Sequence, residues 1–292
     1  MPLRFVHCSD IHLLDLAGNS PARFFNKRLT GGVNLLLARG RKHHHGMFDA
    51  IVEHAREYRA ERLVVTGDLT NLALESEFAL VHRKLAAAGL PVTVVPGNHD
   101  AYTRGSHRAR RFEQSMADFM VGERRGGDYP FVQRFGDVAL VGCSTAHPSL
   151  PLHAVGTVGD EQLARLAGML ADLGREGLTR VVLIHHPVMP GVARPRHSLL
   201  DREAFARVIA EHGAELILHG HEHKRIDGSI PGPRGPVTVH GIGSGTYLSQ
   251  KPGKHGAFSL YDVTPAGITR VYHAWDGNRF VAEAAAPIRV AS

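Results

Sequence analysis

The stretch VVPGNHD, residues Val94–Asp100, decides the fold of this chain. Val92–Val95 is a β-branched apolar run that is typical of a buried strand, and a Pro-Gly turn ends it abruptly. Asn98, His99 and Asp100 follow directly, where open α/β sheets place their ligand crevice. One such triplet is more often a loop that caps a helix. A functional site is indicated only if the pattern recurs.

The pattern does recur, because four other apolar runs also end in polar side chains. The donors at the five ends are Asp10 and His12; Asp68; Asn98 and His99; His185; and His221 and His223. No end supplies a cysteine, which argues against a structural zinc site. Carboxylate, amide and imidazole donors in this number suit two borderline divalent ions such as Mn, Fe, Zn or Co. Asp68 is the natural bridge, since each of its oxygens can bind one ion.

Asp10 and His12 illustrate the alternatives for a single pair. Their spacing predicts that both side chains project to the same side of an extended backbone and can chelate one cation. An aspartate that caps a helix beside a surface histidine explains the pair equally well.

The elements predicted between the runs follow an α/β order. Helical spacing over Met47–Tyr58 and Phe78–Ala88 alternates with strands at Leu3–Cys8, Leu63–Thr66 and Val92–Val95. This order predicts parallel strands with right-handed crossovers. Later elements are a hairpin over Phe131–Cys143, helices over Leu163–Leu173 and Phe205–Ile209, and strands at Val181–Ile184 and Leu216–Leu218.

The chain from Arg225 to about Trp275 alternates short apolar runs with Gly and Pro turns and lacks helical spacing. We expect it to pair antiparallel as a second sheet. Because no repeat, low-complexity tract or linker is visible, the sequence predicts one domain over residues 1–292.

The composition sets wide limits. Of 292 residues 43% are apolar, which supports a sizeable core, and the net charge of +6 suits an anionic partner. That partner could be a phosphorylated small molecule, nucleic acid or an anionic lipid surface. Cys8 and Cys143 lie in apolar runs and are expected to be buried, reduced thiols. No run reaches membrane-spanning length and no signal peptide is visible, so we expect a cytoplasmic protein.

Two basic regions flank the predicted site. Gly18–Lys42 mixes apolar and basic residues, which suits a lid or a membrane-docking insertion, although a helix packed on its own domain is the commoner outcome. The histidines 43–45 after it read as a helix start. Ala101–Arg125 carries Tyr102 and several arginines that form either a wall for a substrate anion or a solvated helix face.

Five sequence blocks resemble those of the calcineurin-like metallophosphoesterases, in the family's order between Ser9 and His223. They are Asp10-Ile11-His12, Gly67-Asp68-Leu69-Thr70-Asn71, Gly97-Asn98-His99-Asp100, His185-His186-Pro187 and Gly220-His221-Glu222-His223. Any single block is weak, whereas the ordered set is specific. The resemblance implies an α/β fold with two packed mixed β-sheets flanked by helices, a four-layer αββα sandwich.

The resemblance also implies the roles of residues. One metal ion would be held by Asp10, His12, Asp68 and His223, and the other by Asp68, Asn98, His185 and His221. His99 would contact the phosphoryl group and assist the leaving oxygen, with Asp100 orienting its ring. His186 would lie behind the ligands, and His219 would be a core or supporting imidazole.

The implied function is hydrolysis of phosphodiester or pyrophosphate bonds with two divalent ions, Mn, Fe or Zn, that activate a hydroxide to attack phosphorus in line. The apolar and basic insertion favours a lipid-linked substrate such as UDP-diacylglucosamine, with peripheral contact to an anionic membrane at its inner face. The alternative is a cyclic-nucleotide phosphodiesterase. A nuclease is disfavoured because no aromatic and basic groove is evident, and an inactive scaffold because every candidate ligand is present.

Overall fold

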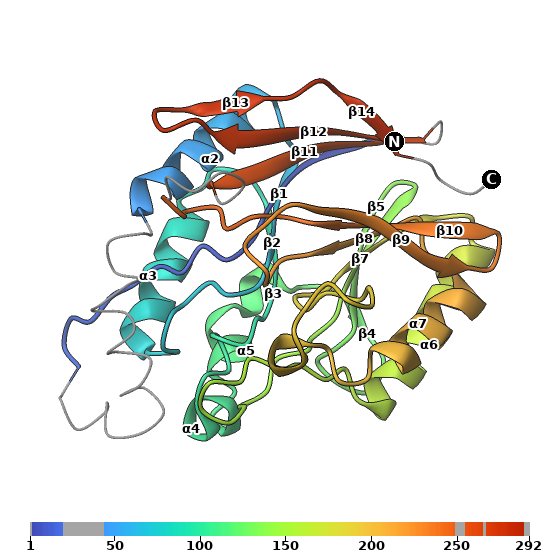
Figure 1. The fold of residues 1–292 in the computed structure, drawn as a ribbon, viewed down its shortest axis with the longest axis horizontal. Coiled ribbons are helices and arrows are strands. Elements are labelled where there is room, and N and C mark those ends of the chain that lie inside the picture. Colours follow the sequence, from blue (N-terminus) through green and yellow to red (C-terminus); the bar gives the residue numbers. More distant parts are fainter. Residues whose placement is uncertain (1, 20–43, 249–254, 265–266, 289–292) are drawn as a thin grey trace.

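A computed structural model of the chain describes residues 2–19, 44–248, 255–264 and 267–288. Two mixed β-sheets form its centre, each with seven strands among these residues (Figure 1). The first sheet has the order β13-β12-β11-β1-β2-β3, with β14 beside β12. Its strands are β1 (Leu3–Cys8), β2 (Arg62–Thr66), β3 (Val92–Val95), β11 (Ala257–Thr264), β12 (Gly267–Trp275), β13 (Phe280–Ala282) and β14 (Ala286–Ile288).

The second sheet has the order β4-β5-β6-β7-β8-β10-β9, and β6, β7, β8 and β10 are parallel neighbours. The hairpin predicted around Gly136 joins β5 to β6, as expected. The strands are β4 (Glu123–Arg124), β5 (Phe131–Phe135), β6 (Val138–Gly142), β7 (Thr179–Leu183), β8 (Leu216–His219), β9 (Ile226–Gly232) and β10 (Gly235–Gly241).

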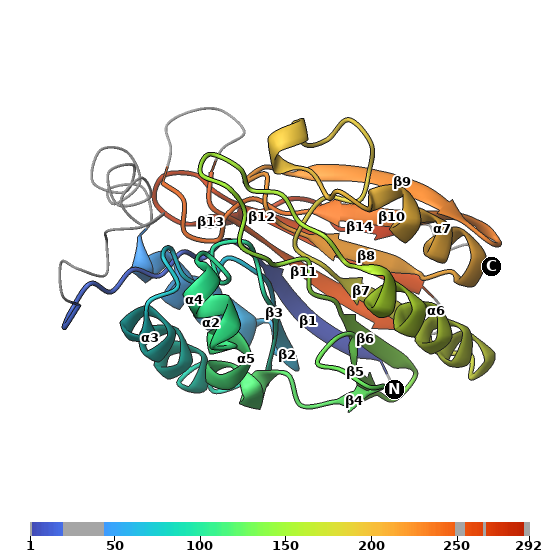
Figure 2. The same ribbon diagram turned by 90° about the horizontal axis from the view of Figure 1, so that it is seen from below.

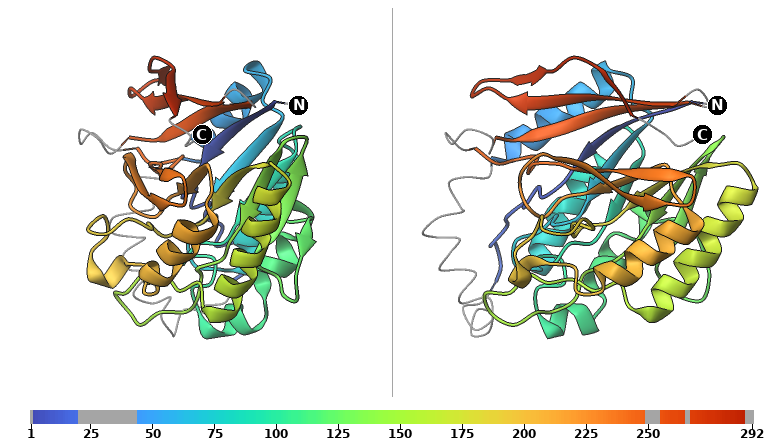
Figure 3. Two further views of the ribbon diagram at one scale, coloured as in Figure 1. Left: turned by 90° about the vertical axis from the view of Figure 1, so that its right-hand side faces the viewer. Right: turned by 45° about the vertical axis from the view of Figure 1, so that its right-hand side comes forward.

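Helices cover the outer faces of the two sheets (Figure 2). Helices α2 (His45–Glu57) and α3 (Glu75–Ala86) pack on the first sheet, and α6 (Asp160–Arg175) and α7 (Arg202–His212) pack on the second. The short helices are α4 (Arg104–Arg108), α5 (Arg111–Ser115), η3 (Ala117–Phe119) and η4 (Pro195–His197). This is the predicted αββα sandwich, seen edge-on in Figure 3.

Strand β7 shows how alternation builds the layers. Val181 and Leu183 belong to the core between the sheets, whereas Val182 and Ile184, the residue that follows β7, belong to the core beneath α6 and α7. Because successive side chains of a strand point to opposite faces, an uninterrupted apolar run is what a strand buried on both faces requires.

The prediction for Arg225–Trp275 is wrong in its pairing. β9 and β10 complete the second sheet, where β10 runs parallel to β8. β11 and β12 instead join the first sheet, because β11 pairs antiparallel with β1 and its Tyr261 ring stacks on Phe5 at 5.1 Å. Local periodicity indicates that a segment is a strand, but it carries no information on which open sheet edge the strand will pair with.

Some of the remaining predictions fall within the described residues, and others fall outside them. Helix α2 begins at His45, within the histidine triplet, and both cysteines are buried and free. Beyond Asn19 the insertion Gly18–Lys42 lies outside the described residues, so its role stays a prediction, as does the single domain. In the described part of the chain no helix has the length and apolar character that crossing a bilayer requires.

Candidate metal centre

Five strands end at one place, where the carboxyl edges of the two sheets meet. β1, β2 and β3 are parallel in the first sheet, and β7 and β8 are parallel in the second. The loops that leave these ends are therefore neighbours, as in other α/β sheets. They carry all the predicted ligands: Asp10 and His12 after β1, Asp68 after β2, Asn98 after β3, His185 after β7, and His221 and His223 after β8.

The first cluster combines Asp10, His12, Asp68 and His223, whose donor atoms all lie within 4.8 Å of one another. Asp10 Oδ1 lies 3.1 Å from His223 Nε2, and His12 Nε2 lies 3.7 Å from Asp68 Oδ2. Ligands of one ion at bonds of about 2.1 Å are spaced by roughly 3 Å, so this set fits one cation. Asp10 Oδ1 is buried and faces the ring nitrogen of His223, and a cation between the two atoms would satisfy both.

The second cluster surrounds His185 Nε2. This atom lies 3.2 Å from Asn98 Oδ1, 3.2 Å from His221 Nδ1 and 3.5 Å from Asp68 Oδ1. Oδ1 of Asp68 therefore faces the second cluster, while Oδ2 of the same carboxylate faces His12 in the first cluster. One carboxylate between two donor sets is the arrangement that a bridged pair of ions requires.

Backbone carbonyls determine which ring nitrogen of these histidines carries a proton. His185 Nδ1 donates to the Thr66 carbonyl at 2.7 Å, and His221 Nε2 donates to the His197 carbonyl at 2.9 Å. In the neutral rings the opposite nitrogen of each keeps its lone pair and turns it toward the cluster. His185 Nε2 then has only acceptor atoms around it, so a positive charge is required between them.

The charges of the site agree with this conclusion. Burial alone would lower the pKa of His185. The Asp68 carboxylate has the opposite effect and outweighs burial, so the pKa rises to about 9. Burial raises the pKa of Asp68, and the surrounding imidazoles, His185 first, bring it well below the usual value. In the chain without ions a proton on His185 thus supplies the positive charge. The donors fit divalent cations, which would displace that proton.

Five ligands adopt left-handed backbone conformations: Asp10 (φ 53°), His12 (φ 42°), Asp68 (φ 52°), His221 (φ 75°) and His223 (φ 51°). This region costs on the order of 1 kcal/mol for a residue with a Cβ. The expectation that Asp10 and His12 converge on extended backbone is therefore wrong, since two left-handed residues aim their side chains. Strain of this kind persists at functional sites because the surroundings hold it in place.

Two glycines of the sequence blocks, Gly97 and Gly220, are required because ligand side chains lie very close to their backbone. A Cβ on Gly97 would lie 2.2 Å from Asp68 Oδ1, and one on Gly220 would lie 1.9 Å from Ser9 Oγ and 2.4 Å from Asp10 Oδ2. Any side chain at either position would therefore displace a ligand carboxylate.

His99 lies beside both clusters without joining either. Its backbone N–H donates to Asp68 Oδ1 at 2.8 Å, and its ring meets the His12 ring edge-on at 4.9 Å. Its Nδ1 donates to the Asn71 carbonyl at 2.7 Å, which fixes the orientation of the ring. The ring is also stacked on the Tyr102 ring, with the two centroids 5.4 Å apart.

The expected role of Asp100 in orienting His99 is not what the structure shows, because the Asn71 carbonyl holds that ring. Asp100 instead accepts hydrogen bonds from the backbone N–H groups of Gly97, Leu69 and Thr70. Burial and the nearby Asp68 raise the pKa of Asp100 to about 7. Asp100 thus ties the loop after β3 to the loop after β2.

Glu77 was not predicted to support the site. It accepts from the backbone N–H groups of Asn71, Leu72 and Leu74 and so fixes the rest of the loop after β2. Its position three residues after Leu74, which precedes α3, was the available signal, because glutamate there reaches back to the first free N–H groups of a helix.

The structure also shows the surroundings of the other arginines and histidines that the sequence analysis named. Arg110 pairs with Asp128 and Arg111 with Glu75, so neither offers a free charge to a substrate. His186 is buried behind the ligands, where Nδ1 bonds the hydroxyl of Thr145. His219 is buried with Nδ1 at the Gly220 carbonyl, in agreement with a supporting role.

Comparison with known protein families gives a match across most of the chain. The family model of the calcineurin-like phosphoesterases matches residues 3–225. Among curated proteins, a glycerophosphodiester phosphodiesterase (GpdQ) of Enterobacter lignolyticus is 28% identical over 134 residues, 45% of this chain and 44% of the relative. A probable cyclic nucleotide phosphodiesterase of a Psychrobacter species is 24% identical over 196 residues, 65% of this chain and 55% of the relative. The matches thus span about half of each relative.

Solved structures show the same fold at low identity. A dimetal phosphatase from Danio rerio superposes with a TM-score of 0.66 at 16% identity, covering 99% of both chains. The purple acid phosphatase PPD1 from yellow lupin, Lupinus luteus, gives a TM-score of 0.62 at 13% identity, covering 97% of this chain and 53% of the other.

Proposed function

Since this chain belongs to the calcineurin-like phosphoesterase family, we propose that it hydrolyses phosphodiester or pyrophosphate bonds with the help of two divalent ions. One observation carries the proposal: the Asp68 carboxylate stands between two sets of lone-pair donors, with Oδ2 toward His12 and Oδ1 toward His185. Divalent ions held there would supply positive charge for the phosphoryl oxygens and lower the pKa of a water.

We assign metal binding and proton transfer to the following residues of the chain. Asp10, His12, Asp68 and His223 would hold one ion, and Asp68, Asn98, His185 and His221 the other. The Nδ1 atom of His99 is held by the Asn71 carbonyl, and we assign its Nε2 atom to the substrate. When both ring nitrogens are protonated, Nε2–H can donate to a phosphoryl oxygen or give its proton to the leaving oxygen.

The bond-making is a displacement at phosphorus. A water oxygen forms a new bond to phosphorus, and the bond from phosphorus to the leaving oxygen breaks with its electron pair. The leaving oxygen takes a proton from His99, which the water ultimately replaces. The site needs no covalent intermediate with a side chain for this reaction.

For the substrate we favour a lipid-linked phosphate such as UDP-diacylglucosamine. Leu150, Leu152 and Leu200 are 68%, 79% and 61% exposed, and they lie on two loops joined by the Leu200 N–H to Gly156 carbonyl bond. These apolar side chains, together with the composition of residues 18–42, suit an amphiphilic substrate. Removal of residues 18–42 should weaken co-sedimentation with anionic liposomes if the segment docks to membranes.

A cyclic-nucleotide phosphodiesterase is the alternative, favoured by the named activity of the Psychrobacter relative. A panel with added Mn²⁺ separates the two: bis-para-nitrophenyl phosphate, cyclic AMP and UDP-diacylglucosamine. We expect hydrolysis of the nitrophenyl diester and of UDP-diacylglucosamine, and none by Asp68→Asn. Turnover of cyclic AMP alone would replace the lipid substrate, and no turnover of any compound would refute the proposed function.

A further inference from the structure

A cavity adjoins Tyr102, whose ring is a neighbour of the His99 ring. It has a volume of about 590 Å³ and is lined by Tyr102, Thr103, Arg104, Gly105, Ser106, Arg111, Pro148, Ser149, Leu150 and Pro151. Tyr102 connects it to the site, because its ring stacks on the face of the His99 ring at 5.4 Å with 20° between the planes. Tyr102 is therefore the residue that both lines the cavity and contacts the His99 ring.

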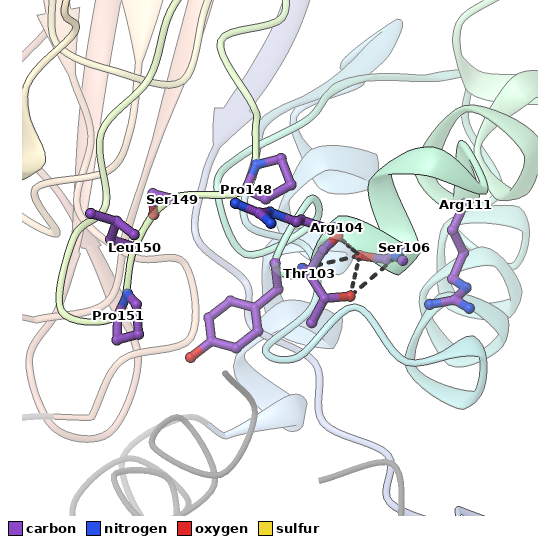
Figure 4. Close-up of a pocket in the computed structure, with 10 residues that line it drawn as sticks. Thr103, Arg104, Ser106, Arg111, Pro148, Ser149, Leu150 and Pro151 are labelled. Atoms are coloured by element: carbon purple, nitrogen blue, oxygen red, sulfur yellow. Dashed lines mark hydrogen bonds between the residues drawn. The ribbon is translucent and has the colours of Figure 1, made fainter. Parts of the chain in front are cut away.

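Arg104 supplies the available positive charge of this cavity. Figure 4 shows its side chain reaching toward Pro148 and Ser149, whereas Arg111 lies on the far side of Ser106. Arg111 is also neutralised by Glu75 and donates to the Ala73 carbonyl. Arg104 is exposed and makes no hydrogen bond or ion pair with any described residue.

The other polar groups of the wall are already engaged. Thr103 Oγ1 accepts from the Ser106 N–H at 3.1 Å, and Ser106 Oγ donates to the Thr103 carbonyl at 2.9 Å (Figure 4). The opposite wall holds Pro148, Leu150 and Pro151 together with Ser149, whose hydroxyl donates to the His153 carbonyl. The cavity therefore combines one unpaired guanidinium with a surface of mixed polar and apolar character.

We propose that this cavity receives the leaving group of the substrate and that Arg104 selects leaving groups that carry a second anion. The inference rests on the proposed function, because it takes His99 as the group that faces the leaving oxygen. A group departing beside His99 extends past Tyr102 into the cavity, where a carboxylate or phosphate on it meets Arg104. Arg104 is thus a specificity residue, and a pyrophosphate is favoured over a simple alcohol ester.

Two chromogenic diesters test this: methyl para-nitrophenyl phosphate and its analogue with a carboxylate ortho to the nitro group. In both, water oxygen bonds to phosphorus and the nitrophenolate leaves with the bonding electron pair, so each reaction is followed by its colour. Arg104→Gln should lower kcat/KM for the carboxylated ester roughly fivefold to tenfold more than for the neutral ester. Arg104→Lys should retain most of the preference.

Arg108→Gln is the matched control, because Arg108 is exposed on the same short helix α4 but does not line the cavity. It should leave both rates unchanged. Equilibrium dialysis of the carboxylated nitrophenol gives a second readout that needs no turnover, and Arg104→Gln should weaken that binding while Arg108→Gln does not.

The outcomes separate the two proposals. If Arg104→Gln affected the two esters equally, or bound the carboxylated nitrophenol as tightly as the wild-type chain does, the role of Arg104 would be overturned. The hydrolase proposal would remain intact. Failure of the wild-type chain with Mn²⁺ to hydrolyse either ester would overturn both.

Discussion

The two sheet edges that form the site hold their ligands in different ways. The first sheet supplies every oxygen donor, and two buried carboxylates hold its loops: Asp100 joins the loop after β3 to the loop after β2, and Glu77 fixes the rest of the loop after β2. The second sheet supplies only imidazoles, whose rings are held by carbonyls such as those of Thr66 and His197. Negative charge attracts the cations, whereas neutral imidazoles complete their coordination. We therefore expect the first edge to determine whether ions bind.

The largest effect should come from removing the bridge. Asp68→Ala takes one charged donor from each cluster, and we expect the metal content to fall from two ions to one or none and kcat/KM to fall at least about 10⁴-fold. His221→Ala, on the second edge, removes a neutral donor from one cluster and should retain the ion held by Asp10 and His223. Metal analysis of both variants checks this, and equal losses would remove the distinction between the edges.

His99→Ala separates ion binding from catalysis on the first edge. Because His99 contributes its backbone N–H, not its ring, to Asp68, the variant should keep its metal content. Turnover should fall roughly 10²-fold to 10³-fold, the usual contribution of a proton donor. A variant with normal turnover would show that the ring has no part in the reaction.

Asp100→Ala tests whether the first edge depends on its carboxylate tie. Three buried N–H groups, those of Gly97, Leu69 and Thr70, lose their acceptor. Unpaired buried groups cost about 1–3 kcal/mol each, so we expect a loss of about 3 kcal/mol or more in the free energy of unfolding. Urea unfolding in the presence of a chelator measures this without a contribution from metal. Asp100→Asn keeps one acceptor oxygen and should lose less; an unchanged midpoint for Asp100→Ala would contradict the assignment.

The smallest effect that we expect is on the pH dependence of stability, and it arises from His7, a buried histidine of β1. Burial, and next the neighbouring His219, lower the pKa of His7 to about 3. Between that value and about 6.5 the unfolded chain binds a proton at His7 that the folded chain does not, so stability falls as the pH drops through this window. At pH 5 the contribution is about 2 kcal/mol.

His7→Gln removes that proton and should reduce the difference in unfolding free energy between pH 7 and pH 5 by about this amount. The subtraction of variant from wild type cancels the titration of the metal ligands. An identical pH dependence in the two proteins would show that the pKa of His7 is the same in the folded and the unfolded chain.

Much of the site could be predicted because its donors follow strands. Five apolar runs with polar ends identify the ligands, and the parallel order of the strands brings those ends to one edge. The roles of Asp100 and Glu77 could not be predicted in the same way. A carboxylate that accepts from backbone N–H groups depends on loop conformations, which here include left-handed residues that the sequence does not mark.

The fold shows the same limit. Alternating apolar residues identified β11 and β12 as strands, yet their partner is β1, more than 250 residues earlier for pairs such as Arg4 and Asp262. Such a pairing depends on which sheet edge is free after the rest has folded. Local pattern therefore predicts elements and strand ends better than it predicts long-range neighbours.

The bond from His185 to the Thr66 carbonyl has a wider consequence, because it crosses from one sheet to the other. The His221 N–H makes a second such crossing to Asp10 Oδ2 at 3.0 Å. Occupation of the centre and docking of the sheets are consequently one linked equilibrium. Excess manganese should raise the melting temperature, and a core substitution distant from every ligand, if it loosens the seam, should register as weaker ion affinity.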